Sequence, residues 1–280
     1  MPKKDKPIIV AVSSDHHAGS TVGLCPPVFN LDDGGTYRAS TAQRWLWRNW
    51  YSNYIPRVKE LADQYDTRYI AILDGDVIEG NHHHTTQVIS NNETTQMRIA
   101  EEVLAPLLQD ADQVYFIRGT PAHVGQGARL EEKVAENWTN TIQHGKNYTR
   151  WHLYLDVNRT LFDIAHKGGI GRLPWTRPNA VNKVLGAAII AYHQMDKKTP
   201  NVILRAHWHQ YADSGDNYRN IRAIAMPGWQ LITGYVNSMT PGIIADIGGL
   251  IFTCWPNKVY DLEIMRFFPK STKAIKVRSW

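Results

Sequence analysis

The chain has 280 residues, a mildly basic composition with a formal net charge of +5 and a pI of about 9.1, and only two cysteines. Two cysteines do not make a disulfide framework, no apolar run is long enough to cross a bilayer, and the basic start leads into a strand pattern rather than a signal peptide. These features exclude a disulfide-stapled scaffold and a membrane-spanning protein, and they predict a cytoplasmic protein. We expect one domain over residues 1–280, because no linker, repeat or low-complexity tract interrupts the sequence.

Strand and helix patterns alternate over the first half of the chain. Short apolar runs predict buried strands at residues 7–12, 69–73 and 114–118. Longer segments with an apolar stripe predict helices at residues 41–64, 93–109 and 130–138. Pro56 predicts a kink in the first helix, and Pro106 predicts a break near the end of the second. The polar segments 18–40 and 81–92 are expected to be loops.

The second half of the chain is richer in strands. Residues 151–156 and 160–165 predict an antiparallel hairpin. Further strands are expected at residues 201–206, 221–226, 250–254 and 259–267, with one long helix at 179–195. Strands that alternate with helices and then pair with one another predict an α/β fold with two packed sheets and helices outside.

The strand at 69–73 ends in a loop that carries three acids, Asp74, Asp76 and Glu79. Ligands in open α/β sheets bind beyond the carboxyl ends of the strands, so these side chains are expected to meet at a binding site. Clustered carboxylates repel one another unless a cation lies between them. Asp74 is expected to bond backbone amides at the sheet end.

Other metal-ligating side chains follow other predicted strands. Asp15 and His17 follow the first strand, His166 follows the hairpin, and a His-x-His pair follows the strand at 201–206. Residues two apart on a strand share a face, so each pair can turn to one ion. Carboxylate and imidazole ligands together favour Mn, Fe, Zn, Ni or Co over Mg or Ca. The pattern therefore predicts a metal centre.

The order of these motifs resembles that of the calcineurin-like metallophosphoesterase superfamily. Asp-x-His, Gly-Asp-x-x-Glu, a Gly-to-His segment, a lone His and His-x-His follow one another over residues 8–209. The superfamily includes protein phosphatases, cyclic-nucleotide phosphodiesterases, purple acid phosphatases and the Mre11/SbcD nucleases. The resemblance implies a four-layer α/β/β/α sandwich of two mixed sheets, and the chain is similar in length to phage-borne members.

The resemblance also implies roles for individual residues. The ligands of two divalent ions, with manganese as the leading candidate, would be Asp15, His17 and His209 for one ion, His166 and His207 for the other, and Asp76 for both. Glu79 would orient a ligand or a water. Two such ions lower the pKa of a bound water and hold phosphoryl oxygens in line, and His123 would donate a proton to the leaving oxygen.

The segment between Gly119 and His123 departs from the family pattern. The family usually has Gly-Asn-His there, with the Asn on the second metal. Thr120 stands in place of that Asn, and two further residues precede His123. Thr120 remains the expected ligand. Its reach is shorter than that of Asn, so the second ion is expected to be held more weakly or by a different ligand. His83 and Arg118 are the expected substrate-binding residues, although Arg118 could equally be a surface charge.

These observations predict a metal-dependent phosphodiesterase or nuclease-like phosphoesterase that acts on nucleic acid or nucleotides. A phosphomonoesterase for a small molecule or a phosphoprotein is the alternative, and the substitution at Thr120 leaves open a non-catalytic scaffold. The mild basicity fits either solubility or a polyanionic partner. The tryptophans of the 41–64 helix favour packing against a sheet over base stacking, because of the area that they bury.

Overall fold

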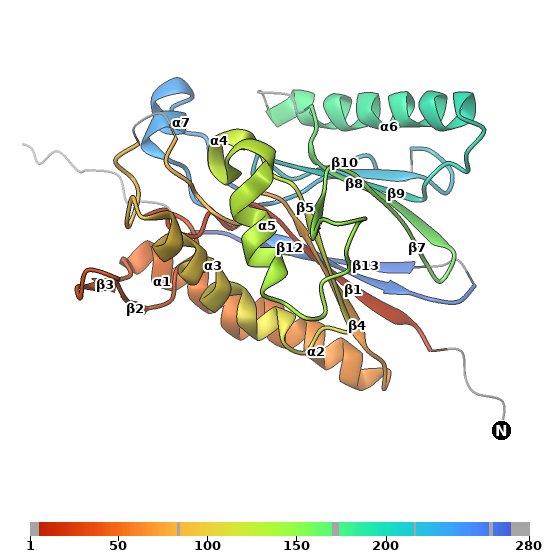
Figure 1. Ribbon diagram of the computed structural model, residues 1–280. Coiled ribbons are helices and arrows are strands. Elements are labelled where there is room, and N and C mark those ends of the chain that lie inside the picture. Colours follow the sequence, from red (N-terminus) through yellow and green to blue (C-terminus); the bar gives the residue numbers. More distant parts are fainter. Residues whose placement is uncertain (1–5, 83–84, 170–173, 216, 258–259, 270–280) are drawn as a thin grey trace, which may run out of the picture.

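Two mixed β-sheets are stacked face to face in the computed structural model, and helices cover the outer face of each (Figure 1). The structure describes residues 6–82, 85–169, 174–215, 217–257 and 260–269. The expected four-layer α/β/β/α sandwich of two mixed sheets is confirmed.

The first sheet combines parallel and antiparallel strands. Its six strands, in spatial order, are β13 (Tyr260–Phe267), β12 (Ile247–Cys254), β1 (Ile8–Ser13), β4 (Tyr69–Asp74), β5 (Gln113–Ile117) and β6 (Thr149–Arg150). Strands β1, β4, β5 and β6 are parallel, whereas β12 runs antiparallel to β1 and β13. The carboxyl ends of β1, β4 and β5 therefore meet at one edge.

The second sheet has the same mixed character. Its strands, in spatial order, are β10 (Ala212–Asp213), β11 (Arg222–Ala225), β9 (Val202–Ala206), β8 (Thr160–Lys167) and β7 (Leu153–Val157). Strands β8, β9 and β11 are parallel. The predicted hairpin is β7–β8, and both residues of its turn, Asn158 and Arg159, have positive φ. Such a turn matches the twist of the two strands.

Strand β1 shows how the layers are held together. Ile9 and Ala11 pack against the helices of the first outer layer, and Val10 and Val12 pack against the second sheet. This is the period-two alternation of a strand that is buried on both faces. The core between the sheets is completed by apolar side chains from both of them, including Ile70, Ile72, Phe162, Ile164, Val202, Leu204, Leu250 and Phe252.

The outer helices differ in number between the two faces. The first sheet is covered by α1 (Thr41–Asn49), α2 (Ile55–Gln64), α3 (Glu93–Leu108) and α5 (Arg129–Glu136), and the second by α6 (Arg177–Gln194). Trp50 and Tyr54 are fully buried, and the Tyr54 hydroxyl donates to the carbonyls of Val12 and Leu250. These two aromatic residues therefore pack on the sheet, as predicted.

The two prolines behave differently from one another. A π-helical turn, Trp50–Tyr54, separates α1 from α2 directly before Pro56, and the Ile55 N–H donates to the Trp50 carbonyl. This wider turn is the predicted irregularity in the first helix. The break predicted at Pro106 is wrong, because α3 continues two residues beyond it. The buried side chains of Leu107 and Leu108 hold that last turn against the core.

Several short elements were not expected. The 18–40 segment contains a small hairpin, β2 (Val28–Asn30) and β3 (Thr36–Arg38). Single helical turns occur at α4 (Pro121–Val124), α7 (Gly234–Met239), Gln126–Ala128 and Pro174–Thr176. Among the described residues, no helix is long and apolar enough to cross a membrane.

Candidate metal centre

The loops that follow β1 and β4 are bonded to each other beyond the edge of the first sheet. The backbone N–H of Asp15 donates to the Gly75 carbonyl at 3.0 Å, and that of His17 donates to the Asp76 carbonyl at the same distance. A side-chain oxygen of Asp15 also accepts the backbone N–H of His207, which follows β9 in the second sheet. The predicted ligands of both sheets therefore come together, as expected for strand ends of an α/β fold.

Five of these residues have a backbone conformation that non-glycine residues rarely adopt. Their φ angles are +53° at Asp15, +47° at His17, +51° at Asp76, +78° at His207 and +49° at His209. Residues in such conformations carry a cost, and they gather at functional sites where the surrounding structure holds them in place. Alternate side chains of each loop, Asp15 and His17 in one and His207 and His209 in the other, contribute to the site.

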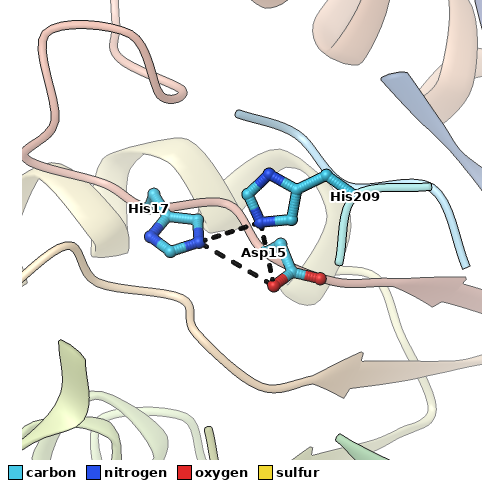
Figure 2. A group of neighbouring side chains, drawn as sticks. All are labelled: Asp15, His17 and His209. Carbon is cyan, nitrogen blue, oxygen red and sulfur yellow. Dashed lines mark hydrogen bonds and ion pairs between the residues drawn. The ribbon is translucent and has the colours of Figure 1, made fainter. Parts of the chain in front are cut away.

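Asp15, His17 and His209 form the first ligand group (Figure 2). The two imidazoles approach through their Nε2 atoms, 3.2 Å apart. Oδ1 of Asp15 lies 3.2 Å from Nε2 of His209 and 3.8 Å from Nε2 of His17. Three ligand atoms that face one point in this way can hold a divalent ion.

Asp76, His166 and His207 form the second ligand group. Oδ2 of Asp76 lies 2.9 Å from Nε2 of His166 and 3.8 Å from Nδ1 of His207. Nε2 of His166 is also 3.9 Å from Oδ1 of Asp15, so the two groups adjoin each other. The other nitrogen of His166, Nδ1, donates to the Asp74 carbonyl at 2.6 Å, which sets the ring orientation.

Charge within the site favours a cation. Burial alone would raise the pKa of both Asp15 and Asp76, but neighbouring histidines outweigh it and hold the pKa of each carboxyl well below its usual range. Burial would lower the pKa of His17, but contacts with Asp15 and Glu79 raise that pKa to about 10. Oδ1 of Asp15 is buried without a hydrogen-bond partner among the described residues. Ionised carboxylates and an unsatisfied oxygen fit bound metal ions.

Glu79 lies directly behind the first ligand group. Its Oε2 atom is 2.9 Å from Nδ1 of His17, the nitrogen that faces away from His209, and it accepts a hydrogen bond from Gln230 at 2.8 Å. Oε1 lies 3.1 Å from Nε2 of His82. Despite burial, the hydrogen bond with His17 and that with His82 lower the pKa of Glu79 to about 2. An ionised carboxylate on Nδ1 fixes the tautomer that leaves Nε2 for a metal.

Two glycines leave the space that the ligands need. A Cβ atom at Gly75, where φ is +78°, would lie 2.4 Å from Nδ1 of His166. A Cβ atom at Gly119 would lie 2.2 Å from Oδ1 of Asp76. Both distances are far below van der Waals contact, so a side chain at either position would displace a ligand.

Thr120 contacts the carboxylate of Asp76. Its backbone N–H donates to Oδ1 at 2.7 Å, and its hydroxyl lies 3.2 Å from Oδ1 and 3.1 Å from Oδ2. The threonine therefore orients Asp76, and its role as a metal ligand stays a prediction. Glu131 of α5 supports the same loop, since its carboxylate accepts the backbone N–H groups of Val77 and Gly119 at 3.2 and 2.7 Å.

His123 lies beside the first ligand group. Its ring centroid is 4.5 Å from that of His17, and its Nδ1 donates to the Glu79 carbonyl at 2.7 Å. Burial and the nearby His17 lower the pKa of His123 to about 4, so the ring is neutral at pH 7 before substrate binds. Nε2 is the nitrogen that remains for a substrate.

Asp74 differs from the expectation. It is fully buried, and neither carboxylate oxygen has a hydrogen-bond partner among the described residues. The prediction that it bonds backbone amides is wrong, because no donor among the described residues reaches its carboxylate. Burial raises the pKa of Asp74 to about 7.

Arg118, one of the two expected substrate-binding residues, is not part of this cluster. Nε of Arg118 donates to the Thr149 hydroxyl at 2.8 Å, and its guanidinium stacks on Trp151. Its role in substrate binding stays a prediction. His83 lies outside the described residues.

Sequence reasoning missed two supporting residues, Gln230 and Glu131. The first has no motif around it, and the second is one of the acids at the start of α5 that fit the helix dipole equally well.

Comparison of the sequence with models of protein families and with curated proteins found no significant match. Comparison with solved structures found remote likeness. Vps29 of Entamoeba histolytica, in complex with zinc, is 9% identical with a TM-score of 0.38, and the match covers 92% of this chain and 98% of that one. A predicted phosphoesterase of Streptococcus pneumoniae is 8% identical, with a TM-score of 0.35 and coverage of 92% and 97%.

The sulfate thiohydrolase SoxB of Thermus thermophilus, in complex with glycerol, is 10% identical with a TM-score of 0.43. That match covers 95% of this chain and 57% of the longer SoxB chain. The sheet topology and the order of the candidate ligands agree with the expected resemblance to the calcineurin-like metallophosphoesterases. Kinship with Mre11-like or phage-borne members in particular stays a prediction.

Proposed function

We propose that this protein is a phosphoesterase that depends on two divalent metal ions and acts in the cytoplasm as a single catalytic domain. The observation that carries the proposal is the pair of adjoining ligand groups, each made of one buried aspartate and two histidines, with Asp15 3.9 Å from His166 across their boundary. Two neighbouring sites of this composition are expected for metal-assisted hydrolysis of a phosphoester.

Each ligand residue has a distinct part. Asp15, His17 and His209 would hold one ion, His166 and His207 would hold the other, and Asp76 would contribute to both. Thr120 fixes the Asp76 carboxylate through its N–H and hydroxyl. When bound, the ions supply an activated water and neutralise charge on phosphoryl oxygens. Manganese is the metal that we expect, and zinc, iron, nickel or cobalt have compatible ligand preferences.

His123 protonates the leaving oxygen of the ester. Its Nδ1 is held by the Glu79 carbonyl, so Nε2 is presented for this step. The negative charge of a bound phosphoester favours the protonated ring, which offsets the low pKa of the free site. Glu79 acts indirectly, by orienting His17.

A phosphodiester of nucleic acid or of a nucleotide is the substrate class that we favour. The formal net charge of +5 supports a polyanionic substrate. A phosphomonoesterase would use the same ligands. A scaffold without catalysis is the second candidate, because the Thr120 hydroxyl lies on Asp76 where the family has an amide ligand.

A substrate panel tests the proposal. The protein, supplied with Mn²⁺, is assayed on bis(p-nitrophenyl) phosphate, on p-nitrophenyl phosphate and on single-stranded DNA. Asp76→Asn is the inactive variant, and Glu93→Gln, at an exposed ion pair with Arg129, is the matched carboxylate control. We expect the wild-type protein and Glu93→Gln to hydrolyse the diester and the DNA, and Asp76→Asn to lose both activities. Preference for the monoester favours the first alternative, and no metal-dependent hydrolysis by the wild-type protein favours a scaffold.

A further inference from the structure

The indole of Trp208 lies between two candidate ligands and is open to solvent. The residue separates His207 from His209, and 44% of its surface is exposed. Its ring centroid is 5.0 Å from that of His207, with the planes at 70°. His207 belongs to the second ligand group and faces Asp76, so the indole contacts one member of that group.

The indole is held in place without any ligand. Its Nε1 donates to the Gly168 carbonyl at 2.6 Å, two residues after the candidate ligand His166. The positive φ angles of His207 and His209 fix the backbone on both sides. The one polar atom of the side chain is therefore satisfied inside the protein, and what remains exposed is apolar ring surface. A rigid aromatic surface loses little entropy when a flat partner covers it.

Basic side chains lie on segments that are bonded to the loop of Trp208. Lys167, beside Gly168, is exposed. Asp246 is bonded to the residue after Trp208, because its backbone N–H donates to the His209 carbonyl at 2.8 Å. Arg177 lies 3.7 Å from the Asp246 carboxylate, and Arg266 bonds the same carboxylate. An aromatic surface with basic side chains on adjoining segments is the chemistry of single-stranded nucleic-acid recognition.

We propose that Trp208 is a nucleobase subsite, on which the base next to the scissile phosphodiester stacks, and that the substrate class is single-stranded nucleic acid. The inference rests on the proposed hydrolysis at the adjoining metal centre and names the substrate for it. Stacking is tolerant of base identity, because every base has a π-face. A base within a duplex has both faces covered and cannot use this subsite.

Matched chromogenic esters test the subsite. Thymidine 5′-(p-nitrophenyl phosphate) and methyl p-nitrophenyl phosphate share a leaving group and differ in the presence of a base. For Trp208→Ala we expect kcat/KM on the thymidine ester to fall about 5- to 150-fold, mainly through KM, as one stacking contact implies. The methyl ester should be hydrolysed as by the wild-type protein, and Trp208→Phe should retain most of the preference. Equal losses on both esters would overturn the inference.

Trp255 provides the matched control. Its indole Nε1 also donates within the protein, to Asp261 at 2.8 Å. It follows β12 at the end where Cys254 pairs with Ile8, the first residue of β1, and the metal ligands follow the other end of β1. Trp255→Ala should leave both esters unaffected.

A binding measurement separates this inference from the proposed hydrolysis. Fluorescein-labelled hexathymidylate with phosphorothioate linkages, which resist cleavage, is compared by anisotropy with an abasic strand of the same length and charge. The metal-loaded wild-type protein should bind the base-bearing strand about 5- to 150-fold more tightly, and Trp208→Ala should remove the difference. If the wild-type protein shows this preference and Trp208→Ala lacks it, but no ester is hydrolysed, the subsite is supported and the proposed function is refuted. Equal affinity of the wild-type protein for both strands, or binding of neither, would refute the subsite.

Discussion

The Nε2 atoms of His17 and His209 lie 3.2 Å apart, although 192 positions separate the two residues in the sequence. His17 follows β1 of the first sheet, and His209 follows β9 of the second. The candidate site therefore spans both sheets, and the apolar core between them sets the distance between its two halves. Two ring nitrogens that face each other beside an ionised aspartate can share either a proton or a metal ion, and the metal ion is the basis of the predictions below.

Replacing Glu79 by Gln should weaken the first metal site selectively. The amide keeps the shape of the side chain but removes the charge that accepts from Nδ1 of His17. Loss of such a supporting hydrogen bond lowers metal affinity by about 10- to 100-fold. Competition with a fluorescent chelator measures the two affinities. Glu93→Gln should match the wild type, and a Glu79→Gln variant with unchanged affinity at both sites would refute this role.

A methyl group at Gly119 should displace Asp76 without unfolding the protein. The added Cβ of Gly119→Ala would lie 2.2 Å from Oδ1 of Asp76, so we expect loss of metal binding while the circular dichroism spectrum is kept. Gly186, within α6, is the matched control, because a Cβ there meets nothing within 4 Å. Gly186→Ala should stabilise the protein by about 1 kcal/mol through helix propensity and leave metal binding unchanged. Normal metal content in Gly119→Ala would contradict the geometry.

His123→Ala should discriminate between leaving groups. A proton donor matters most when the leaving oxygen is a poor leaving group, such as a sugar hydroxyl, and such catalysis contributes about 10²- to 10⁴-fold. We expect a loss of that size for a dinucleotide and a much smaller loss for a p-nitrophenyl diester. Equal losses for both substrates would instead indicate that His123 only positions the phosphoryl group.

Stability of the metal-free protein should fall between about pH 4.5 and pH 8 because of Glu131. Burial and the nearby Asp76 raise the pKa of this carboxyl from 4.5 to about 8. The folded state therefore retains a proton that the unfolded chain releases. The stabilising contribution of Glu131 to the free energy of unfolding is complete below pH 4.5 and is lost as the pH rises through 8. Urea unfolding in EDTA measures the slope. Glu131→Gln should flatten it, and an unchanged slope in this variant would refute the assignment.

The strands and the candidate ligands could be predicted because both depend on local pattern. Short apolar runs fix the strands, and parallel strands of one sheet must end at one edge, so Asp15 and Asp76 had to approach each other. The stacking of the second sheet brings His166 to them. The i, i+2 spacing of His207 and His209 places both rings at one strand end. The helix with Pro56 was expected to be irregular for an equally local reason, the missing N–H.

Other features depend on tertiary packing that no local pattern encodes. Glu131 reaches Gly119 only because of how α5 docks on the sheet. The buried Asp74 carboxylate lacks the amide partners that were expected for it. The orientation of the Arg118 side chain depends on the edge strand β6, because the hydroxyl of Thr149 in that strand accepts a hydrogen bond from Nε of Arg118. The sequence alone did not indicate β6.

Metal content per chain tests the central claim most directly. The protein is stripped with chelator, loaded with Mn²⁺, desalted and measured by inductively coupled plasma mass spectrometry. We expect two ions per chain in the wild-type protein, one in His209→Ala, one in His207→Ala, and two in His152→Ala, a histidine paired with Asp163 outside both ligand groups. A wild-type protein that binds no ion, or variants at His207 and His209 that both retain two, would contradict the dinuclear centre.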